Sequence, residues 1–296
     1  MDVSIIIINY NTKDLTLNCI NSITSKTFSL TYELIIVDNA SIDGSQALLR
    51  REYPDIILIE SERNLGFGRA NNLGAVKAQG KYLFFLNSDT VLLNDSIYQL
   101  FQFNELKKSK LRIGICGGVL IDKNGSETGS FGPLPNMTNT LKSIVGIYPR
   151  FTRMTSAETT FYHENHFLEV GYIMGADMFI EKSIFDTIGG FDPNLFIYYE
   201  ETDLQFRLKK ANYHNYLISG PKIVHFEGGC TPKTYANNFK RLVITKSMFY
   251  YFRKHSGYFN YLLFKIVYFL IRLTTIFYPS YSWKEKKEYF LQILKS

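Results

Sequence analysis

Hydrophobic and polar positions alternate in blocks along the first 120 residues of the chain. Stretches of helical periodicity predict helices near residues 15–23, 45–51 and 68–78, and short apolar runs predict strands at residues 4–8, 34–37, 56–59 and 82–86. Strands that alternate with helices in this way are typical of a mostly parallel sheet with helices on both faces. We therefore expect an α/β fold in this part of the chain.

The pattern changes after this region. Residues 122–168 are rich in Gly, Pro, Thr and Asn and show weak periodicity, which predicts a long loop region. Order returns from Gly171, with an apolar run at residues 176–180, a turn at Gly189-Gly190 and an expected helix over residues 200–211. Long loops in compact domains are usually functional or disordered.

The composition is that of a packed, intracellular protein. With 296 residues and 46% hydrophobic content, the chain can form one large domain or one domain plus an appendage. Its three cysteines, Cys19, Cys116 and Cys230, are far apart and odd in number, so we expect neither a disulfide framework nor a metal cluster. The N-terminus lacks the basic flank and the apolar length of a signal peptide. These features predict a cytoplasmic protein.

The net charge of +6 is distributed unevenly. Residues 231–296 carry twelve Lys or Arg against two Glu, a net of +10, which leaves 21 minus 25, or −4, for residues 1–230. Within this basic, aromatic tail, Lys265 and Arg272 interrupt an apolar stretch at residues 258–278. Cations seven residues apart share a helix face and are costly at a bilayer centre. The tail therefore predicts a helix lying in the interface of an anionic membrane; the alternative is an amphipathic helix packed on the core.

An acidic residue stands at or just after the carboxyl end of two of the predicted strands. Asp38 ends the second apolar run, and Asp89 follows the fourth run after Asn87 and Ser88. Ligands of open α/β sheets bind outside the carboxyl ends of the strands, so we expect both acids to face one crevice. Such an arrangement suits a nucleotide and a metal ion.

Each of these acids has two interpretations. Asp38 can accept a hydrogen bond from a nucleobase imide or a ribose hydroxyl, or it can cap the turn before a helix that begins at Gly44 or Ser45. Asn87 and Asp89 can hold Mg²⁺ or Mn²⁺ together with substrate phosphates, or Asp89 can serve as a helix N-cap.

A glycine-rich segment at residues 64–72 leads into the third predicted helix and can present backbone N–H groups to an anion. It is not a GxGxxG sequence, and none follows the first strand, which ends at Asn9-Tyr10-Asn11. The pattern therefore disfavours a dinucleotide-binding protein. We expect a tight loop beside the crevice.

An acidic cluster, Glu200, Glu201 and Asp203, directly follows a strongly aromatic run. Carboxylates held against apolar surface have a raised pKa that suits a general base, although the helix dipole opposes this shift. The alternative is a solvated acidic helix N-terminus. His225 ends a later apolar run, where it is either a core residue or, if Asp89 lies nearby, a metal ligand.

Together these motifs resemble the family 2 glycosyltransferases, inverting enzymes of GT-A fold, and especially their bacterial rhamnosyltransferase-like branch. The resemblance runs from Val3 to about Thr231. It rests on Val3-Ser4-Ile5-Ile6 with Asn9-Tyr10-Asn11, Val37-Asp38-Asn39-Ala40-Ser41 to Gly44-Ser45, Asn64-Leu65-Gly66-Phe67, Leu86-Asn87-Ser88-Asp89-Thr90, Gly189-Gly190-Phe191-Asp192 and Tyr199 to Leu204. It implies a mostly parallel central sheet flanked by helices, with a helical C-terminal extension.

The resemblance also implies roles for these residues. Asp38 resembles the acid that reads the pyrimidine base of the donor. Asp89 matches the final acid of the DXD motif, which holds Mn²⁺ or Mg²⁺ on the diphosphate, and His225 matches a position that can complete this metal site. Glu201 occupies the place of the general base, where the family usually has Asp, with Glu200 as its competitor. The other expected donor-binding residues are Asn9, Tyr10, Asn11, Asn64, Gly66, Asn71 and Asn87, the last in place of the first DXD acid, and Glu200 and Asp203 are expected on the acceptor side.

The implied function is transfer of a sugar from a nucleotide-diphosphate donor, dTDP-rhamnose or a UDP-sugar, to a glycan acceptor. The tail favours a lipid-linked acceptor at the inner face of the plasma membrane, in bacterial cell-surface polysaccharide synthesis, and we expect no nucleic-acid partner. We expect a catalytic domain at residues 1–230, with a donor half at 1–120 and an acceptor half at 121–230, followed by a membrane-associating tail at 231–296.

Two other classes compete with this hypothesis. A nucleotidyltransferase should carry a glycine-rich, basic loop after its first strand, where this chain has Asn9-Tyr10-Asn11-Thr12. A non-catalytic nucleotide-sugar-binding or membrane scaffold protein would tolerate loss of the acidic cluster, which is intact here.

Overall fold

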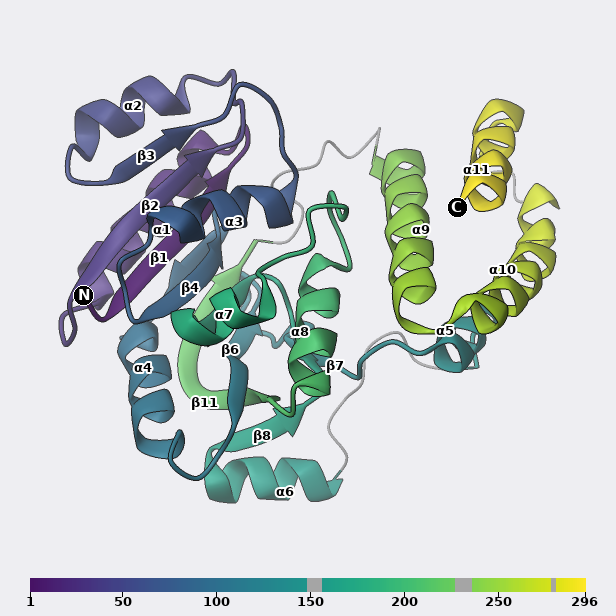
Figure 1. The fold of residues 1–296 in the computed structure, drawn as a ribbon. Helices are drawn as coiled ribbons and strands as arrows, with labels where there is room; N and C mark the ends of the chain where they lie inside the picture. The colour runs from purple at the N-terminus through teal and green to yellow at the C-terminus, as the bar shows by residue number, and fades with distance from the viewer. Residues whose placement is uncertain (148–155, 227–235, 278–280) are drawn as a thin grey trace.

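The structure is a computed structural model, and it describes residues 1–147, 156–226, 236–277 and 281–296. Within these residues, a nine-stranded sheet forms the centre, and helices cover both of its faces (Figure 1). The expected boundary between residues 230 and 231, Cys230 and Tyr278 lie outside the described residues.

The sheet is parallel at one end and mixed at the other. Its first four strands in spatial order are parallel, as the alternation of strands and helices predicts. Beyond them β10 runs antiparallel to β4 and β6. The chain enters β10 at the edge of the sheet where β4 ends, and there the Asn87 N–H donates to the Ala176 carbonyl (3.0 Å). The full order is β3 (Ile57–Glu60), β2 (Tyr32–Asp38), β1 (Val3–Asn9), β4 (Tyr82–Asn87), β10 (Asp177–Glu181), β6 (Ile113–Ile121), β11 (His214–His225) and β5 (Thr90–Leu92), with β8 (Phe167–Val170) paired to β11.

Successive side chains of the central strands point to opposite faces of the sheet. Ile5 and Ile7 join one buried cluster and Ile6 joins the other. The first face is covered by α1 (Lys13–Lys26), α2 (Ser45–Glu52) and α4 (Ser96–Lys107), and the second by α3 (Phe67–Lys77), α7 (Lys182–Ile188) and α8 (Glu200–Lys210). Because α3 and α8 share a face and touch, the glycine-rich start of α3 lies near the acidic start of α8.

The prediction of one long loop at residues 122–168 was wrong in part. This region contains β7 (Phe131–Gly132), which pairs with β9 (Tyr172–Ile173), and then α5 (Met137–Ile144), α6 (Ser156–Asn165) and the first half of β8. The Asn136 side chain caps α5 by accepting from the Asn139 N–H. No residue of α5 is fully buried, and its apolar side chains pack against helices far away in sequence. Such a helix depends on tertiary contacts that a local pattern does not reveal.

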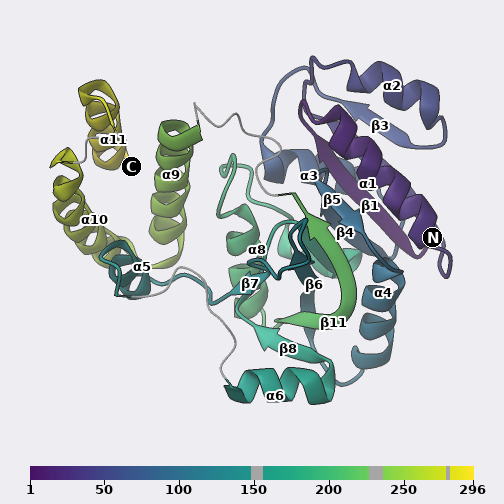
Figure 2. The same ribbon diagram turned by 180° about the vertical axis from the view of Figure 1, so that it is seen from behind.

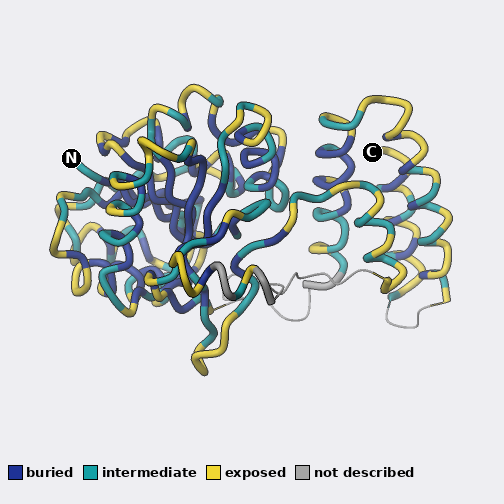
Figure 3. Tube along the Cα trace, turned by 90° about the horizontal axis from the view of Figure 1, so that it is seen from below, coloured by how far each residue is buried: buried dark blue, intermediate teal, exposed yellow. Residues whose placement is uncertain are grey.

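Three C-terminal helices form a bundle beside the sheet (Figures 1 and 2). It has its own aromatic core, built on Phe249, Phe252, Phe264 and Tyr289, and a second band of buried residues is visible there in Figure 3. Phe206 of α8 packs against this core, so α8 contacts both the sheet and the bundle. The helices of this C-terminal bundle are α9 (Ala236–His255), α10 (Tyr258–Arg272) and α11 (Trp283–Lys295), with a short 3-10 helix (Leu273–Phe277) after α10.

Helix α10 has a packed face and an exposed face. Tyr261, Phe264 and Tyr268 are buried in the bundle. On the same side, Lys265 donates to the Leu294 carbonyl (3.0 Å) and Arg272 stacks over the Tyr268 ring. The exposed stripe, defined here as Phe259, Leu263, Ile266 and Leu270, therefore contains no charge. By length and composition the segment Tyr258–Phe277 could cross a membrane, and 22% of its most apolar stretch is buried inside the protein.

Candidate active site

The expected crevice lies where β1, β2 and β4 end. Asn9 is opposite Asp38 in the β1–β2 register, and Ile8 is opposite Asn87 in the β1–β4 register. The three strand-end polar residues therefore lie on neighbouring strands at one edge of the sheet. β10 starts at the same edge, with Asp177 opposite Leu86.

Asp38 is completely buried and both of its oxygens already accept hydrogen bonds. Oδ1 accepts from the Ser41 N–H (2.9 Å) and from the Gln46 side-chain amide (2.6 Å), and Oδ2 accepts from Asn9 Nδ2 (2.6 Å). The turn-capping interpretation of Asp38 is thus present in the structure. A ligand reaches this carboxylate only by displacing one of these donors, and half-buried Gln46 is the most accessible of them.

Asn9 has a structural role in the same network. Its amide donates to Asp38 and to Ser45 Oγ (2.7 Å), and its oxygen accepts from the hydroxyls of Thr12 and Thr16 (both 2.9 Å). The Asn9 side chain is buried and ties β1 to the turn after β2.

Tyr10 and Asn11 face outward at the same edge. Tyr10 is exposed, and Asn11 adopts a left-handed conformation (φ 53°). The Asn11 N–H donates to Ser41 Oγ (3.0 Å), and its side-chain oxygen accepts from the Ile42 N–H (2.8 Å). Asn11 therefore links the loops after β1 and β2.

The glycine-rich loop is fixed by an asparagine that sequence reasoning did not single out. Asn39 donates to Asn64 Oδ1 (2.9 Å) and accepts from the Leu65 N–H (2.7 Å). Gly66 has a φ of +81°, and a Cβ there would lie 2.1 Å from the Phe196 carbonyl oxygen, so only glycine fits. The position of Asn39 directly after Asp38 in the second motif was the available signal.

Asn71 lies inside α3 and not at the crevice edge. Its side chain is buried and donates to the Phe67 carbonyl one turn earlier (3.1 Å). The structure thus gives Asn71 a helix-internal contact, whereas Asn64 and Gly66 stand at the loop.

Asp89 and His225 lie together. β11 pairs antiparallel with β5, which places His225 opposite Thr90. His225 Nε2 is 3.4 Å from Asp89 Oδ1 and 3.5 Å from Asn87 Nδ2. His225 Nδ1 is buried and has no hydrogen-bond partner in the described part of the chain.

This donor set can hold a divalent cation. One carboxylate and one imidazole beside a phosphate-bearing substrate fit Mn²⁺, and Mg²⁺ also uses few protein ligands when phosphates complete its shell. Among the residues that the structure describes, no group of three or more His, Cys, Asp or Glu side chains could hold a metal. A cation held by Asp89 and His225 would therefore need substrate oxygens to complete its coordination shell.

At the start of α8, Glu200 is buried and Glu201 is half-buried. Glu200 is 4% exposed, and its Oε2 has no hydrogen-bond partner within the described ranges. Burial raises the pKa of Glu200 well above its usual range, and the nearby charge of Glu201 adds to this shift. Burial also raises the pKa of Glu201. The solvated-terminus alternative is thus wrong for Glu200, because apolar surroundings outweigh the helix dipole.

Glu201 faces the edge of the crevice. A Cβ on Gly175 would lie 3.7 Å from the Glu201 Cβ and Cγ. Gly175 precedes Ala176, whose carbonyl binds the end of β4. Contacts through two neighbouring residues therefore connect Glu201 to the strand end that carries Asn87 and Asp89.

Asp203 points away from this edge and toward the C-terminal bundle. Its carboxylate accepts from Arg207 (2.8 Å), Lys254 (2.7 Å) and His255 (2.7 Å). Burial opposes ionisation, but the His255 hydrogen bond and the charges of Arg207 and Lys254 lower the pKa of Asp203 to about 2. Lys254 also binds Asp192 (2.6 Å). The contacts of Asp203 are therefore structural, and its cationic partners were not identifiable from the sequence.

Comparisons with known proteins identify the family and the fold of the chain. The family model described as glycosyl transferase family 2 matches residues 4–156, about half of the chain. An N-acetylglucosaminyl-diphospho-decaprenol L-rhamnosyltransferase of Mycobacterium tuberculosis (strain ATCC 25618 / H37Rv) is 26% identical over 223 residues, which are 69% of this chain and 70% of that protein. A poly(ribitol-phosphate) beta-glucosyltransferase of Bacillus spizizenii (strain ATCC 23059 / NRRL B-14472 / W23) is 31% identical over 124 residues, 40% of this chain and 20% of that protein.

Two solved structures share the fold. GalNAc-T7, crystallised with UDP, GalNAc and Mn²⁺, superposes with a TM-score of 0.60 at 15% identity, over 94% of this chain and 58% of that one. TarS of S. aureus superposes with a TM-score of 0.57 at 12% identity, over 99% of this chain and 49% of that one. The chain thus spans about half the length of these structures, and the likeness concerns the fold.

The fold and the crevice define a glycosyltransferase of GT-A type. The chain belongs to glycosyl transferase family 2, and it is similar to an L-rhamnosyltransferase. The family, the fold class and the enzyme class predicted from the sequence are confirmed.

Proposed function

We propose that this protein is an inverting glycosyltransferase that moves a sugar from a nucleotide-diphosphate donor to a hydroxyl of a lipid-linked glycan. The donor is dTDP-rhamnose, with a UDP-sugar as the alternative, and the pathway is cell-surface polysaccharide synthesis. The supporting observation is the position of Glu201, which lies against Gly175 beside the strand end that carries Asp89, and burial raises the pKa of Glu201 as a general base requires. Similarity to the mycobacterial rhamnosyltransferase supports the choice of donor and acceptor class.

Glu201 acts as the general base. It takes the proton of the acceptor hydroxyl while the acceptor oxygen forms a bond to the anomeric carbon from the face opposite the diphosphate. The bond from this carbon to the diphosphate oxygen breaks, and its electron pair leaves with the diphosphate. A single displacement of this kind inverts the anomeric configuration.

The strand ends hold the donor. Asn11, Tyr10 and the loop at residues 64–66 form the rim of the nucleotide site, and Asp38 accepts the base imide N–H once the Gln46 amide moves aside. Asp89 and His225 would hold Mn²⁺ or Mg²⁺, and the cation would supply positive charge to neutralise the departing diphosphate.

A thermal-shift panel of dTDP, UDP, GDP and dTDP-rhamnose, each with and without Mn²⁺, tests this function. We expect metal-dependent stabilisation by dTDP or UDP, because a ligand that binds the native state raises the melting temperature. In the Asp89→Asn variant the Mn²⁺-dependent part of the shift should disappear. If folded wild-type protein shows no shift with any nucleotide, the non-catalytic scaffold becomes the better hypothesis.

The C-terminal bundle associates with the cytoplasmic face of an anionic membrane. The exposed stripe of α10 presents four large apolar side chains, and Lys265 and Arg272 turn toward the bundle instead of interrupting it. A chain segment with net charge +10 adds attraction to anionic lipid. We expect the protein to float with vesicles that contain phosphatidylglycerol and to remain free of pure phosphatidylcholine vesicles. Equal recovery with both vesicles would remove the electrostatic part of this proposal, and no recovery with either would remove membrane association itself.

A further inference from the structure

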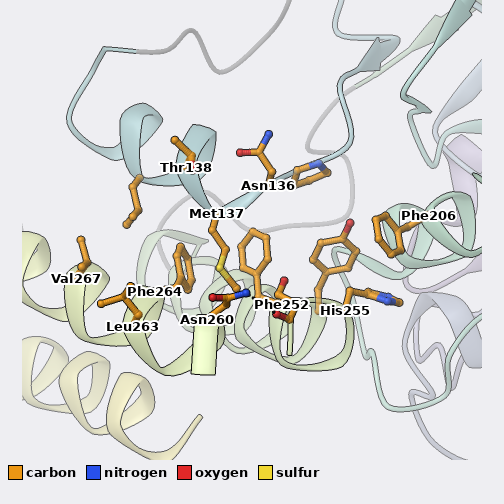
Figure 4. Close-up of a pocket in the computed structure, with 14 residues that line it drawn as sticks. Asn136, Met137, Thr138, Phe206, Phe252, His255, Asn260, Leu263, Phe264 and Val267 are labelled. Carbon is orange, nitrogen blue, oxygen red and sulfur yellow. Dashed lines mark hydrogen bonds between the residues drawn. The ribbon is translucent and has the colours of Figure 1, made fainter. Parts of the chain in front are cut away.

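A second concave site lies away from the nucleotide crevice, between α5, α8, α9 and α10. It is a groove of ≈ 510 Å³, within the usual size range of ligand pockets (Figure 4). Apolar side chains dominate its lining, among them Met137, Leu141, Phe252, Leu263 and Val267. Among the described residues that line it there is no Asp or Glu.

The outer end of the groove joins the exposed stripe of α10. Leu263 lines the groove and is also 55% exposed on the stripe. Leu263 therefore joins the apolar surface of the stripe to the lining of the groove.

The inner end of the groove points to the catalytic helix. His255 lines it and pairs with Asp203 of α8 (2.7 Å), and Phe206 of the same helix is part of the wall. α8 begins with Glu200 and Glu201.

The chain itself limits the distance from this groove to the base. Asn136 lines the groove, and Gly132 lies against the Tyr172 ring, since a Cβ at Gly132 would be 2.7 Å from Tyr172 Cε1. Tyr172 precedes Ile173, whose N–H donates to Gln205 Oε1 of α8 (2.6 Å), and Gln205 Nε2 donates to the Glu201 carbonyl (3.1 Å). Three residues lie between Gly132 and Asn136, so this part of the path spans at most about 14 Å.

We propose that this groove binds the first isoprenoid units of a lipid-linked acceptor, next to the diphosphate that carries the acceptor sugar. The inference rests on the proposed function and names its acceptor site. An isoprenoid diphosphate suits the groove because the lining offers apolar surface along its length, polar groups such as His255 and Asn136 at the inner end, and no carboxylate to repel the diphosphate among the described lining residues.

Binding of free isoprenoid diphosphates tests the groove without the need for catalysis. We would titrate the full chain with farnesyl diphosphate and isopentenyl diphosphate by calorimetry, without divalent cation so that the donor site does not capture the diphosphate. Farnesyl diphosphate is expected to bind at least about ten-fold more tightly, because ten additional carbons enter the apolar groove. Equal affinities for the two compounds would overturn the proposal, as would no measurable binding of farnesyl diphosphate.

Matched variants separate the groove from the exposed stripe. Leu263→Asp and Ile266→Asp each place one carboxylate on α10, at positions that are 55% and 50% exposed, but only Leu263 lines the groove. We expect Leu263→Asp to weaken farnesyl diphosphate binding at least about ten-fold and Ile266→Asp to change it by less than about two-fold. Thr138→Trp, which fills the groove from α5 without a charge, should match Leu263→Asp. Equal losses in Leu263→Asp and Ile266→Asp would show adsorption to the stripe and overturn the groove.

The nucleotide panel keeps the two proposals apart. Both α10 variants should retain the metal-dependent shift with dTDP or UDP, because neither residue touches the strand ends. If nucleotides bind but farnesyl and isopentenyl diphosphate bind equally, the glycosyltransferase function is retained and the groove proposal is rejected. Chain-length dependence without any nucleotide binding would reject the donor site and leave an isoprenoid-binding protein.

Discussion

Replacing Glu201 with glutamine is expected to lower turnover by about two to four orders of magnitude while donor binding stays largely intact. Glutamine keeps the size and the contact with Gly175 but cannot take the proton of the acceptor hydroxyl. Steady-state release of nucleoside diphosphate in the presence of acceptor measures the loss, and the thermal shift with donor nucleotide measures binding. The two readouts together separate chemistry from binding.

Glu200→Gln is the matched control, because Glu200 precedes Glu201 on α8 and its pKa is also raised. The Glu200 Cβ lies against the start of α3, where a Cβ on Gly68 would approach it to 3.5 Å. We therefore expect a much smaller loss of turnover in Glu200→Gln. Near-normal turnover in Glu201→Gln together with a large loss in Glu200→Gln would transfer the role of the base to Glu200.

The pH dependence of turnover follows from the same burial. A general base works in its deprotonated form, and burial favours the protonated form of Glu201, so its pKa lies above the usual value of a glutamic acid. Turnover should therefore be low below this raised pKa and rise with pH through it. A kcat profile that is flat down to the ordinary range of Glu, about pH 4.3, would contradict the assignment.

The donor edge was largely predictable because its motifs are local. Asp38 and Asp89 each end an apolar run, and parallel strands bring such ends to one edge without any long-range information. Gly66 was visible as part of a glycine-rich loop, although the Phe196 carbonyl that excludes a side chain there was not. The sequence predicted a metal role for His225 only if Asp89 lay nearby. The two residues are close because β11 pairs antiparallel with β5, and this pairing could not be predicted from the local pattern.

The acceptor side was less predictable because it is built from distant segments. Asp203 looked like a third acid of the catalytic cluster, yet helical rotation turns it toward Lys254 and His255 of α9. Helix α5 was hidden because its partner is the C-terminal bundle. The groove between them belongs to no single motif, so composition alone suggested a membrane surface and not a cavity.

Replacing Asp203 with asparagine is expected to lower the free energy of unfolding by about 3 kcal/mol at neutral pH. The Asp203 side chain is fully buried, and its loss of charge leaves Arg207 and Lys254 with an incomplete set of partners at the contact between α8 and α9. Lys254 keeps Asp192, and Arg207 keeps the Ile188 and Gly190 carbonyls, which places the effect at the lower end of the range for broken buried pairs. Urea unfolding of both proteins measures the difference.

A matched ion pair and the pH give two checks on this value. Lys182 and Asp186 form a pair with the same four-residue spacing, but their side chains are 27% and 54% exposed, so Asp186→Asn should cost no more than about 0.5 kcal/mol. Because the folded-state pKa of Asp203 is lowered to about 2, its stabilisation is present above the unfolded pKa of about 3.9 and is lost as the pH falls toward 2. The gap between wild type and Asp203→Asn should therefore be full at pH 7 and shrink below about pH 4. A gap that does not change between pH 7 and pH 3, or one no larger than that of Asp186→Asn, would show that this network does not hold the C-terminal bundle against the catalytic helix.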